Sequence, residues 1–165
     1  MRFLGPTLLA SVFVLGACAG GDNKAADTNA TATPAAESAT PAAGAASESG
    51  APITGTVHEV KMVYDGQKYT FEPANLTVKE GDGVKWVMVS GGPHDVAFDE
   101  AGIPAGAADK LKANMPNQQM PLQSPFLMTE NETYTVSFAG LPKGAYNYHC
   151  TPHAAMGMKG TITVQ

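Results

Sequence analysis

Near its C-terminus the chain combines three kinds of side chain that bind soft metal ions. This segment contains the thiol of Cys150, the imidazole of His153 and the thioethers of Met156 and Met158. A second histidine, His94, lies far upstream in the sequence Gly-Gly-Pro-His-Asp-Val. One thiolate, two imidazoles and a weak axial thioether form the ligand set of a mononuclear copper site that transfers electrons. If these side chains meet in space, the sequence predicts such a site.

Each donor in this set has its own chemical role. The Cys150 thiolate would dominate the bonding to copper, and neutral nitrogens of His94 and His153 would complete a trigonal plane. Soft sulfur suits Cu(I), whereas imidazole suits both oxidation states. A rigid site of this kind changes its geometry little on oxidation, which favours fast outer-sphere electron transfer. In the loop after Cys150, Pro152 would stiffen the turn and Gly157 would permit close backbone approach.

Short runs of valine, threonine and aromatic residues, separated by glycine and proline, predict an all-β sandwich downstream of residue 53. The expected strands cover residues 56–64, 69–71, 75–79, 84–89, 96–98, 133–138, 144–150 and 160–164. Cys150 closes one of these strands and His94 lies at the end of another, so the sandwich would position both. Residues 102–123 contain either a short helix or an irregular excursion, and the sequence leaves this open.

The alternation of side chains along a strand separates the remaining histidines from the site. Neighbouring strand residues face opposite sides of a sheet, so His149 would point away from a metal bound by Cys150. Tyr146 and Tyr148 would share the Cys150 side and pack inward. His58, in the first expected strand, is expected to be solvated.

Length and charge limit the possible functions of the chain. It has 165 residues, 10 of them basic and 15 acidic, which gives a formal net charge of −5. Binding to nucleic acid requires a basic face, so this balance argues against it. Residues 53–165 are long enough to bury one hydrophobic core without disulfides, and no second domain fits.

The N-terminal part has the composition of an export signal and a linker. Residues 1–17 combine a basic start with an apolar stretch too short to span a membrane, as in a secretory signal peptide. The stretch ends in Leu-Gly-Ala-Cys, which resembles a bacterial lipobox and implies cleavage before Cys18 and lipidation of its thiol. Ordinary cleavage nearby, leaving a free thiol, is the alternative. Residues 18–52 are rich in Ala, Thr, Ser and Pro, which predicts a disordered, lipidated linker. Because Cys18 and Cys150 have separate roles, we expect no disulfide between them.

Several motifs together resemble those of the plastocyanin family of blue (type 1) copper proteins. They are the loop Cys150-x-Pro152-His153-x-x-x-Gly157-Met158, the pair Gly81-Asp82-x-Val84 and Trp86-Val87, the segment Pro93-His94-x-Val96-x-Phe98-Asp99, and Ile103-Pro104-Ala105-Gly106. The resemblance covers most of residues 53–165. It implies a cupredoxin-like Greek-key β-sandwich that holds one copper ion.

The resemblance also implies a complete ligand set, namely His94, Cys150, His153 and Met158. It favours Met158 over Met156 as the axial ligand, because Met158 directly follows Gly157 as in the family. Met156 would then contribute to an apolar rim around the site.

Two features depart from the family pattern. Plastocyanins usually carry Asn after the first ligand histidine, where it braces the cysteine loop, whereas this chain has Asp95. An ionised Asp95 can accept hydrogen bonds from loop amides but cannot donate them. Its charge near copper would favour Cu(II) and lower the reduction potential. The second departure is the lipid anchor with its linker, which indicates a bacterial electron carrier rather than the photosynthetic protein.

The leading hypothesis is a monomeric, extracytoplasmic or periplasmic single-electron carrier, lipid-anchored to a bacterial membrane and not an enzyme. Its redox partner would be a c-type cytochrome or a copper-containing reductase or oxidase. The family resemblance implies that the edge of the His153 ring lies near the surface within an apolar patch, over which the partner would bind briefly. A copper-delivery or copper-sequestering protein is the alternative, and it requires a labile, exposed site. An enzyme would need a further copper with an open position, for which His58 and His149 offer no second cluster. Zinc in the same ligand set, as an artefact of expression, is a further possibility.

Overall fold

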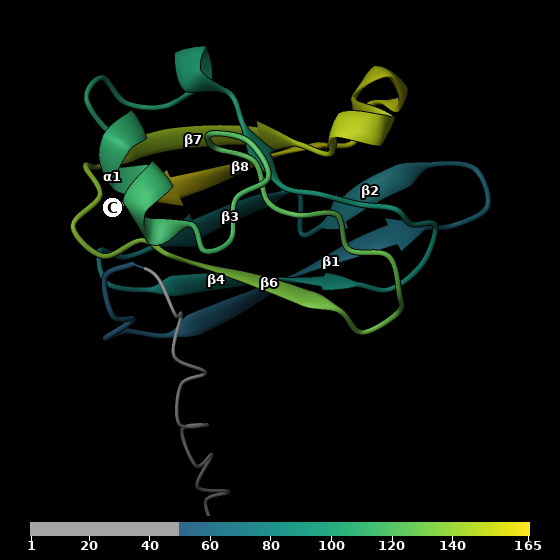
Figure 1. Cartoon of the computed structure of the whole chain (residues 1–165), viewed down its shortest axis with the longest axis horizontal. Coiled ribbons are helices and arrows are strands. Elements are labelled where there is room, and N and C mark those ends of the chain that lie inside the picture. The colour runs from purple at the N-terminus through teal and green to yellow at the C-terminus, as the bar shows by residue number, and fades with distance from the viewer. Residues whose placement is uncertain (1–49) are drawn as a thin grey trace, which may run out of the picture. The chain divides into compact units, whose positions relative to one another are not determined.

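Two four-stranded sheets pack face to face in the computed structural model, which describes residues 50–165 (Figure 1). The first sheet has the spatial order β2 (Tyr69–Glu72), β1 (Val57–Tyr64), β4 (Gly83–Met88) and β6 (Thr133–Ser137). The second has the order β3 (Asn75–Val78), β8 (Lys159–Val164), β7 (Gly144–His149) and β5 (Ala97–Phe98). All eight strands fall where the sequence predicts them. The predicted signal peptide, Cys18 and nearly all of the predicted linker lie outside the described residues.

The core forms between the sheets because apolar residues alternate along the strands. β1 and β4 run parallel, and Val60 is paired in register with Trp86 at their centre. Both side chains are fully buried, as are the neighbouring Met62 and Val84 on the same strands. Fully burying a side chain of this size contributes about 1.5–3 kcal/mol. This rigid double layer is the frame that holds the loops at its ends.

Strand β7 shows the predicted alternation up to the candidate copper ligand. Tyr146 and Tyr148 are buried, and Cys150 directly after the strand is buried as well. His149 faces the other way, and its Nδ1 lies 2.8 Å from a carboxylate oxygen of Asp99. The prediction that His149 points away from the site is therefore confirmed.

Residues 102–123 contain both of the structures that the sequence left open. A short 3-10 helix, η1 (Glu100–Gly102), leads into this segment, and the helix α1 (Ala108–Asn114) follows. The rest is irregular. Asn114 at the end of α1 accepts a hydrogen bond from the Ala51 amide and donates to the carbonyls of Ser137 and Ala139. Within residues 50–165, no helix has the length and apolar character needed to cross a membrane.

An extended segment beside β5 completes the surroundings of His94. His94 forms a backbone bridge with Leu127, and Ala97 forms one with Gln123. Between them, the Ser124 amide donates to the Val96 carbonyl. The irregular stretch after α1 is thereby held against the segment that carries His94.

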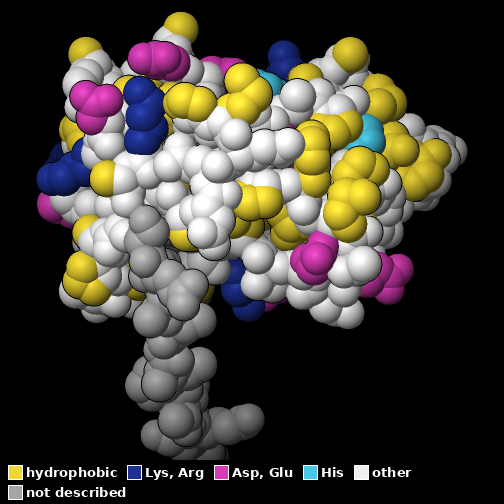
Figure 2. Space-filling model, viewed as in Figure 1, with side chains coloured by type: hydrophobic (Ala, Val, Ile, Leu, Met, Phe, Trp, Pro, Cys, Tyr) yellow, Lys and Arg dark blue, Asp and Glu magenta, His cyan; other side chains and the backbone are white. Residues whose placement is uncertain are grey.

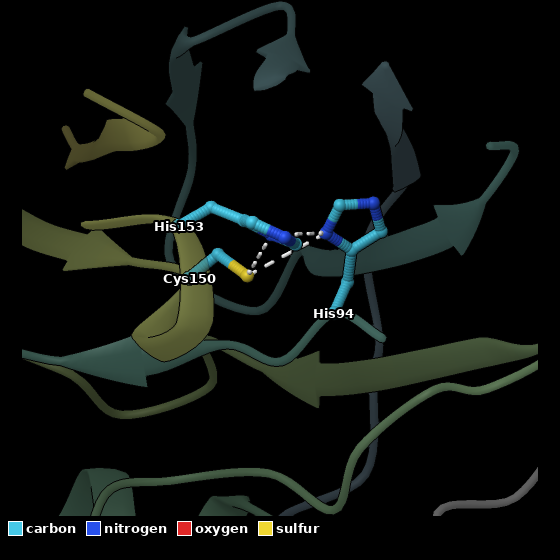
Figure 3. Close-up of side chains that lie close together, drawn as sticks. All are labelled: His94, Cys150 and His153. Carbon is cyan, nitrogen blue, oxygen red and sulfur yellow. Dashed lines mark hydrogen bonds between the residues drawn. The ribbon is translucent and has the colours of Figure 1, made fainter. Parts of the chain in front are cut away.

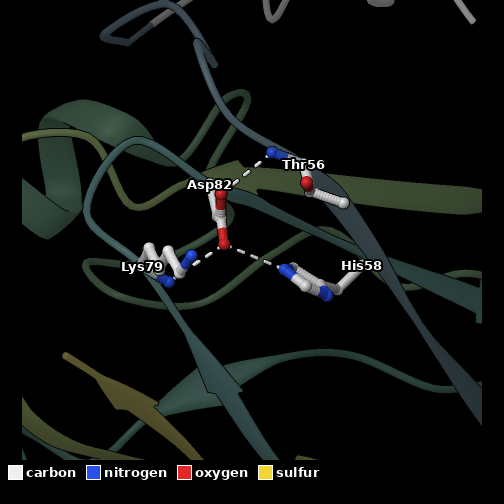
Figure 4. A network of polar contacts seen from close by, with 4 residues as sticks. All are labelled: Thr56, His58, Lys79 and Asp82. Atoms are coloured by element: carbon white, nitrogen blue, oxygen red, sulfur yellow. Dashed lines mark hydrogen bonds and ion pairs between the residues drawn. The ribbon is translucent and has the colours of Figure 1, made fainter. Parts of the chain in front are cut away.

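A polar cluster lies at the opposite end of β4, where the strand begins (Figure 4). The Asp82 carboxylate is almost fully buried and accepts hydrogen bonds from the backbone amides of Thr56 and Lys79. The His58 Nε2 atom lies 2.9 Å from its second oxygen. The expectation that His58 is simply solvated is wrong, because its side chain is 28 % exposed and paired with Asp82. The cluster ties β1 to the turn between β3 and β4.

Candidate metal centre

Three of the four predicted donors meet at the other end of the sandwich (Figure 3). The Cys150 Sγ atom lies 3.5 Å from His94 Nδ1 and 3.3 Å from His153 Nδ1. The two Nδ1 atoms are 3.2 Å apart. His94 comes from the loop after β4, whereas Cys150 and His153 flank the start of η2 (Thr151–Met156). The site therefore joins two segments that are distant in sequence.

The size and chemistry of this triangle fit a single metal ion. The three distances place the point equidistant from all three atoms about 1.9 Å from each. This is close to the roughly 2.0–2.3 Å typical of metal bonds to nitrogen and sulfur. The His94 Nε2 atom donates to the Ser90 carbonyl at 2.8 Å, so its Nδ1 lone pair faces the triangle. Converging lone pairs on soft and borderline donors are the expected environment for copper.

Burial sets the protonation states of the three donors. Burial lowers the pKa of His94 below its ordinary value, although the hydrogen bond to Ser90 opposes this. Burial also lowers the pKa of His153, as does the proximity of His94. Burial raises the pKa of the Cys150 thiol to about 12, so that the thiol stays protonated until a metal ion replaces its proton. Both imidazoles are therefore held in the neutral form that binds metal.

The loop that carries Cys150 and His153 is closed by its own backbone. The Cys150 amide donates to the Met158 carbonyl at 3.1 Å, and the Met158 amide donates to the His153 carbonyl at 3.2 Å. Gly157 ends η2 with a φ of 87°, a left-handed conformation that favours glycine. A Cβ atom at this position would meet no atom within 4 Å. Gly157 is therefore required for its backbone conformation and not, as the sequence suggested, for close packing.

The two candidate axial methionines differ in their surroundings. Met158 is fully buried in the core cluster that also contains Cys150. Met156 is 56 % exposed on the outer side of η2. Met156 therefore lies on the surface of this loop, while the side chain of Met158 is enclosed in the interior.

A tyrosine that the sequence did not single out packs directly on His153. The ring of Tyr69, on β2, stacks on the His153 ring with a centroid distance of 3.7 Å and an interplanar angle of 8°. Tyr64 stacks on the other side of Tyr69 at 4.4 Å. This stack limits rotation of the His153 ring. An aromatic residue in a strand carries no signal of such a role, because core packing is its usual function.

Asp95, the departure from the family pattern, is fully buried beside the site. One carboxylate oxygen accepts a hydrogen bond from the Thr151 amide at 2.6 Å. The other accepts one from the side-chain amide of Gln123 at 2.7 Å. The prediction that Asp95 accepts from an amide of the cysteine loop is confirmed, whereas the contact with Gln123 was not foreseen.

Comparison with known proteins gives a consistent result. Residues 58–165 match the family model described as copper binding proteins, plastocyanin/azurin family. Plastocyanin from Scenedesmus fuscus is 39 % identical over 106 residues, which cover 64 % of this chain and 97 % of that protein. Plastocyanin from Nostoc punctiforme is 38 % identical over 109 residues, 66 % of this chain and 73 % of that protein.

A solved structure supports the same assignment at the level of the fold. Oxidised plastocyanin from the fern Dryopteris crassirhizoma superposes with a TM-score of 0.51 at 28 % sequence identity. The match covers 66 % of this chain and all of the fern protein. It confirms the predicted cupredoxin-like sandwich.

Proposed function

Because the chain belongs to the plastocyanin/azurin family of copper-binding proteins, we propose that His94, Cys150 and His153 would hold its copper ion. Met158 is the proposed fourth ligand, since it is buried in the same core cluster as Cys150 while Met156 is exposed. When bound, the ion alternates between Cu(II) and Cu(I) and thereby accepts and releases one electron. The protein is a single-electron carrier, and we propose that it has no enzymatic activity. The observation that carries this proposal is the convergence of the three donor atoms.

The protein contributes rigidity to this function. The hydrogen bond to Ser90 fixes the His94 ring, and the stack with Tyr69 fixes the His153 ring. Cys150 is held between the end of β7 and the backbone bonds of its loop. A site that cannot rearrange suits both oxidation states equally well, so each electron transfer involves little reorganisation. Burial of all three donors also keeps water from the metal.

An apolar surface around the site suits brief encounters with a redox partner. Figure 2 shows hydrophobic side chains gathered over the end of the molecule that carries β2 and η2. Exposed Met156 lies in the loop of His153, and exposed Phe126 and Met128 flank Leu127, the bridge partner of His94. A c-type cytochrome or a copper-containing reductase or oxidase is the proposed partner. Such redox complexes bury little area and dissociate quickly.

We further propose that the copper domain, residues 53–165, acts outside the cytoplasm as a lipid-anchored monomer. The support is the sequence of residues 1–17, which has the features of a signal peptide, and the cysteine that follows it. Lipidation of Cys18 would attach the protein to a bacterial membrane through the linker of residues 18–52. In a bacterial host, Cys18→Ser should move the protein from the membrane fraction to the soluble fraction. Unchanged membrane association in this variant would exclude the anchor.

Absorption and paramagnetic resonance spectra of the copper-loaded chain test the central proposal. We expect an intense visible sulfur-to-copper band, one copper per chain and reversible uptake of one electron. Cys150→Ala should abolish the band. His149→Ala is the matched control, because His149 adjoins Cys150 but faces Asp99, and its band should be unchanged. A band that survives Cys150→Ala would contradict the proposal, and rapid loss of copper to a mild chelator would favour copper delivery instead.

A further inference from the structure

The buried carboxylate of Asp95 has a dedicated hydrogen-bond donor in Gln123. No part of Asp95 is exposed, so its two oxygens must find donors within the protein. The Thr151 amide supplies one donor and the Gln123 side chain supplies the other. The same Gln123 Nε2 atom also lies 3.2 Å from the Thr151 hydroxyl. Gln123 thus contacts the residue after His94 and the residue after Cys150.

The chain positions Gln123 by means of a strained turn. The Gln123 amide donates to the Met120 carbonyl at 2.9 Å, with Pro121 and Leu122 between them. Leu122 has a φ of 66°, at a turn position that usually takes glycine or asparagine. It is nevertheless buried, and its amide donates to the side-chain oxygen of Gln118 at 2.9 Å. Strain of this kind persists where the surroundings over-determine a conformation, as at functional sites.

We infer that Asp95 and Gln123 form a matched pair that positions the cysteine loop and keeps a negative charge beside the copper ion. This inference rests on the proposed copper function and deepens it. Gln123 acts through Asp95 and Thr151, so it is a positioning residue and not a copper ligand. The donor on Gln123 compensates for the carboxylate, which accepts hydrogen bonds where an asparagine would also donate.

The charge and the pairing have separate consequences. In the redox step Cu(II) takes one electron from the partner and becomes Cu(I), with no proton transferred. A fixed negative charge nearby favours the more positive ion, Cu(II), and thereby lowers the reduction potential. The hydrogen bonds to Thr151 instead fix the backbone next to Cys150. A change that moves the charge but restores the pairing will separate the two effects.

Exchanging the two side chains achieves this separation. Asp95→Asn alone removes the charge but can keep the pairing, because the new asparagine still accepts from the Thr151 amide while the Gln123 side-chain amide turns over to accept from the new NH2 group. Gln123→Glu alone sets two carboxylates against each other. In the double variant Asp95→Asn/Gln123→Glu, the asparagine can donate to the new carboxylate and still accept from Thr151. The negative charge then lies one side chain farther from the site.

The experiment compares the full chain with these three variants by voltammetry, by copper spectra, and by amide exchange of Thr151 in the metal-free protein. For Asp95→Asn we expect about a tenfold higher ratio of Cu(I) to Cu(II) at a fixed applied potential. Gln123→Glu alone should alter the copper spectra and speed exchange at Thr151, whereas Asp95→Asn should leave this exchange slow. The double variant should restore wild-type spectra and slow exchange, while its potential stays above that of the wild type.

Gln119→Glu is the matched control, because it adds the same charge to an exposed position of the same loop. It should leave the spectra and the Thr151 exchange unchanged. The inference is overturned if the double variant exchanges at Thr151 as fast as Gln123→Glu, or if Asp95→Asn leaves the potential unchanged. Failure of the wild-type chain to bind copper would instead refute the proposed function, and the exchange measurement on metal-free protein would still test the pairing.

Discussion

Two aspartates at opposite ends of β4 are buried in the same way but have different structural roles. Asp82 precedes the strand and is 6 % exposed, whereas Asp95 lies beyond its other end and is fully buried. Each carboxylate accepts hydrogen bonds on both of its oxygens. The partners of Asp82 are Thr56 just before β1, His58 in β1, and Lys79 in the turn before β4. A partner of Asp95 directly follows Cys150.

The comparison shows that a buried, hydrogen-bonded carboxylate can support either the fold or the site, depending on which segments carry its hydrogen-bond donors. Asp82 connects strand ends through Thr56, His58 and Lys79, and none of these residues contacts a candidate copper ligand. Asp95 connects the two loops that carry the candidate copper ligands. Changes at Asp82 should therefore lower stability without altering the copper site, whereas changes at Asp95 should alter the copper site.

The largest expected effect on stability comes from Asp82→Asn. The variant loses charge-assisted hydrogen bonds from two backbone amides and from His58, which should lower the free energy of unfolding by about 2–3 kcal/mol at neutral pH. The measurement is denaturant unfolding of the metal-free protein. Glu80→Gln, an exposed acid in the same turn, is the control and should cost less than about 0.5 kcal/mol. An altered copper spectrum in Asp82→Asn would contradict the conclusion that Asp82 supports the fold and not the copper site.

The same residue predicts a specific dependence of stability on pH. Burial alone would raise the pKa of Asp82, but hydrogen bonds from Lys79, His58 and Thr56 hold it below its ordinary value of 3.8. A depressed folded pKa means that the stabilisation is complete above pH 3.8 and is lost as the pH falls through the lower folded value. The stability difference between wild type and Asp82→Asn should shrink over this acidic range. A difference that stays constant there would show that the Asp82 charge is not stabilising.

At the site end, Gly157→Ala should cost about 1–2 kcal/mol of stability, because alanine disfavours the left-handed backbone that ends η2. Since a Cβ atom there meets nothing, the cost should arise from conformation alone. Gly157→Asn tolerates this conformation better and should recover part of the loss. Unfolding of the three proteins gives the comparison. Equal stability of Gly157→Ala and wild type would contradict the role assigned to this glycine.

The smallest expected effect is that of Tyr69→Ala, which removes the ring stacked on His153. Loss of an aromatic pair costs about 0.5–1.5 kcal/mol beyond the buried area. We expect faster loss of copper and broader paramagnetic signals, because the His153 ring gains freedom to rotate. Tyr69→Phe keeps the stack and should behave as wild type. If both variants release copper at the wild-type rate, then the stack does not constrain the ligand.

Strand alternation and loop motifs were sufficient to predict most of the fold and the candidate donors. The period-two pattern of β7 placed Tyr146 and Tyr148 inside and His149 outside. The cysteine loop, together with the family resemblance and the strand-end position that singled out His94, nominated three donors that do converge. These predictions succeed because they depend on local sequence and on the positions of strand ends.

The residues that sequence missed are those whose roles depend on tertiary contacts. Tyr69 reaches His153 from another strand. Gln123 reaches Asp95 from an irregular loop in which Leu122 has a left-handed backbone conformation. The pairing of His58 with Asp82 also arises from separate segments. No local pattern encodes such contacts. The expected reason for Gly157 was wrong. A sequence does not show whether a glycine is required because another atom approaches closely or because the backbone has a positive φ.

X-ray absorption at the copper edge tests the central claim most directly, namely that Cys150, His94 and His153 share one ion. Measured on the copper-loaded chain, it should show one short copper–sulfur bond and two copper–nitrogen bonds, with that short copper–sulfur bond absent in Cys150→Ala. A first shell of oxygen and nitrogen without short sulfur in the wild-type protein would contradict the account.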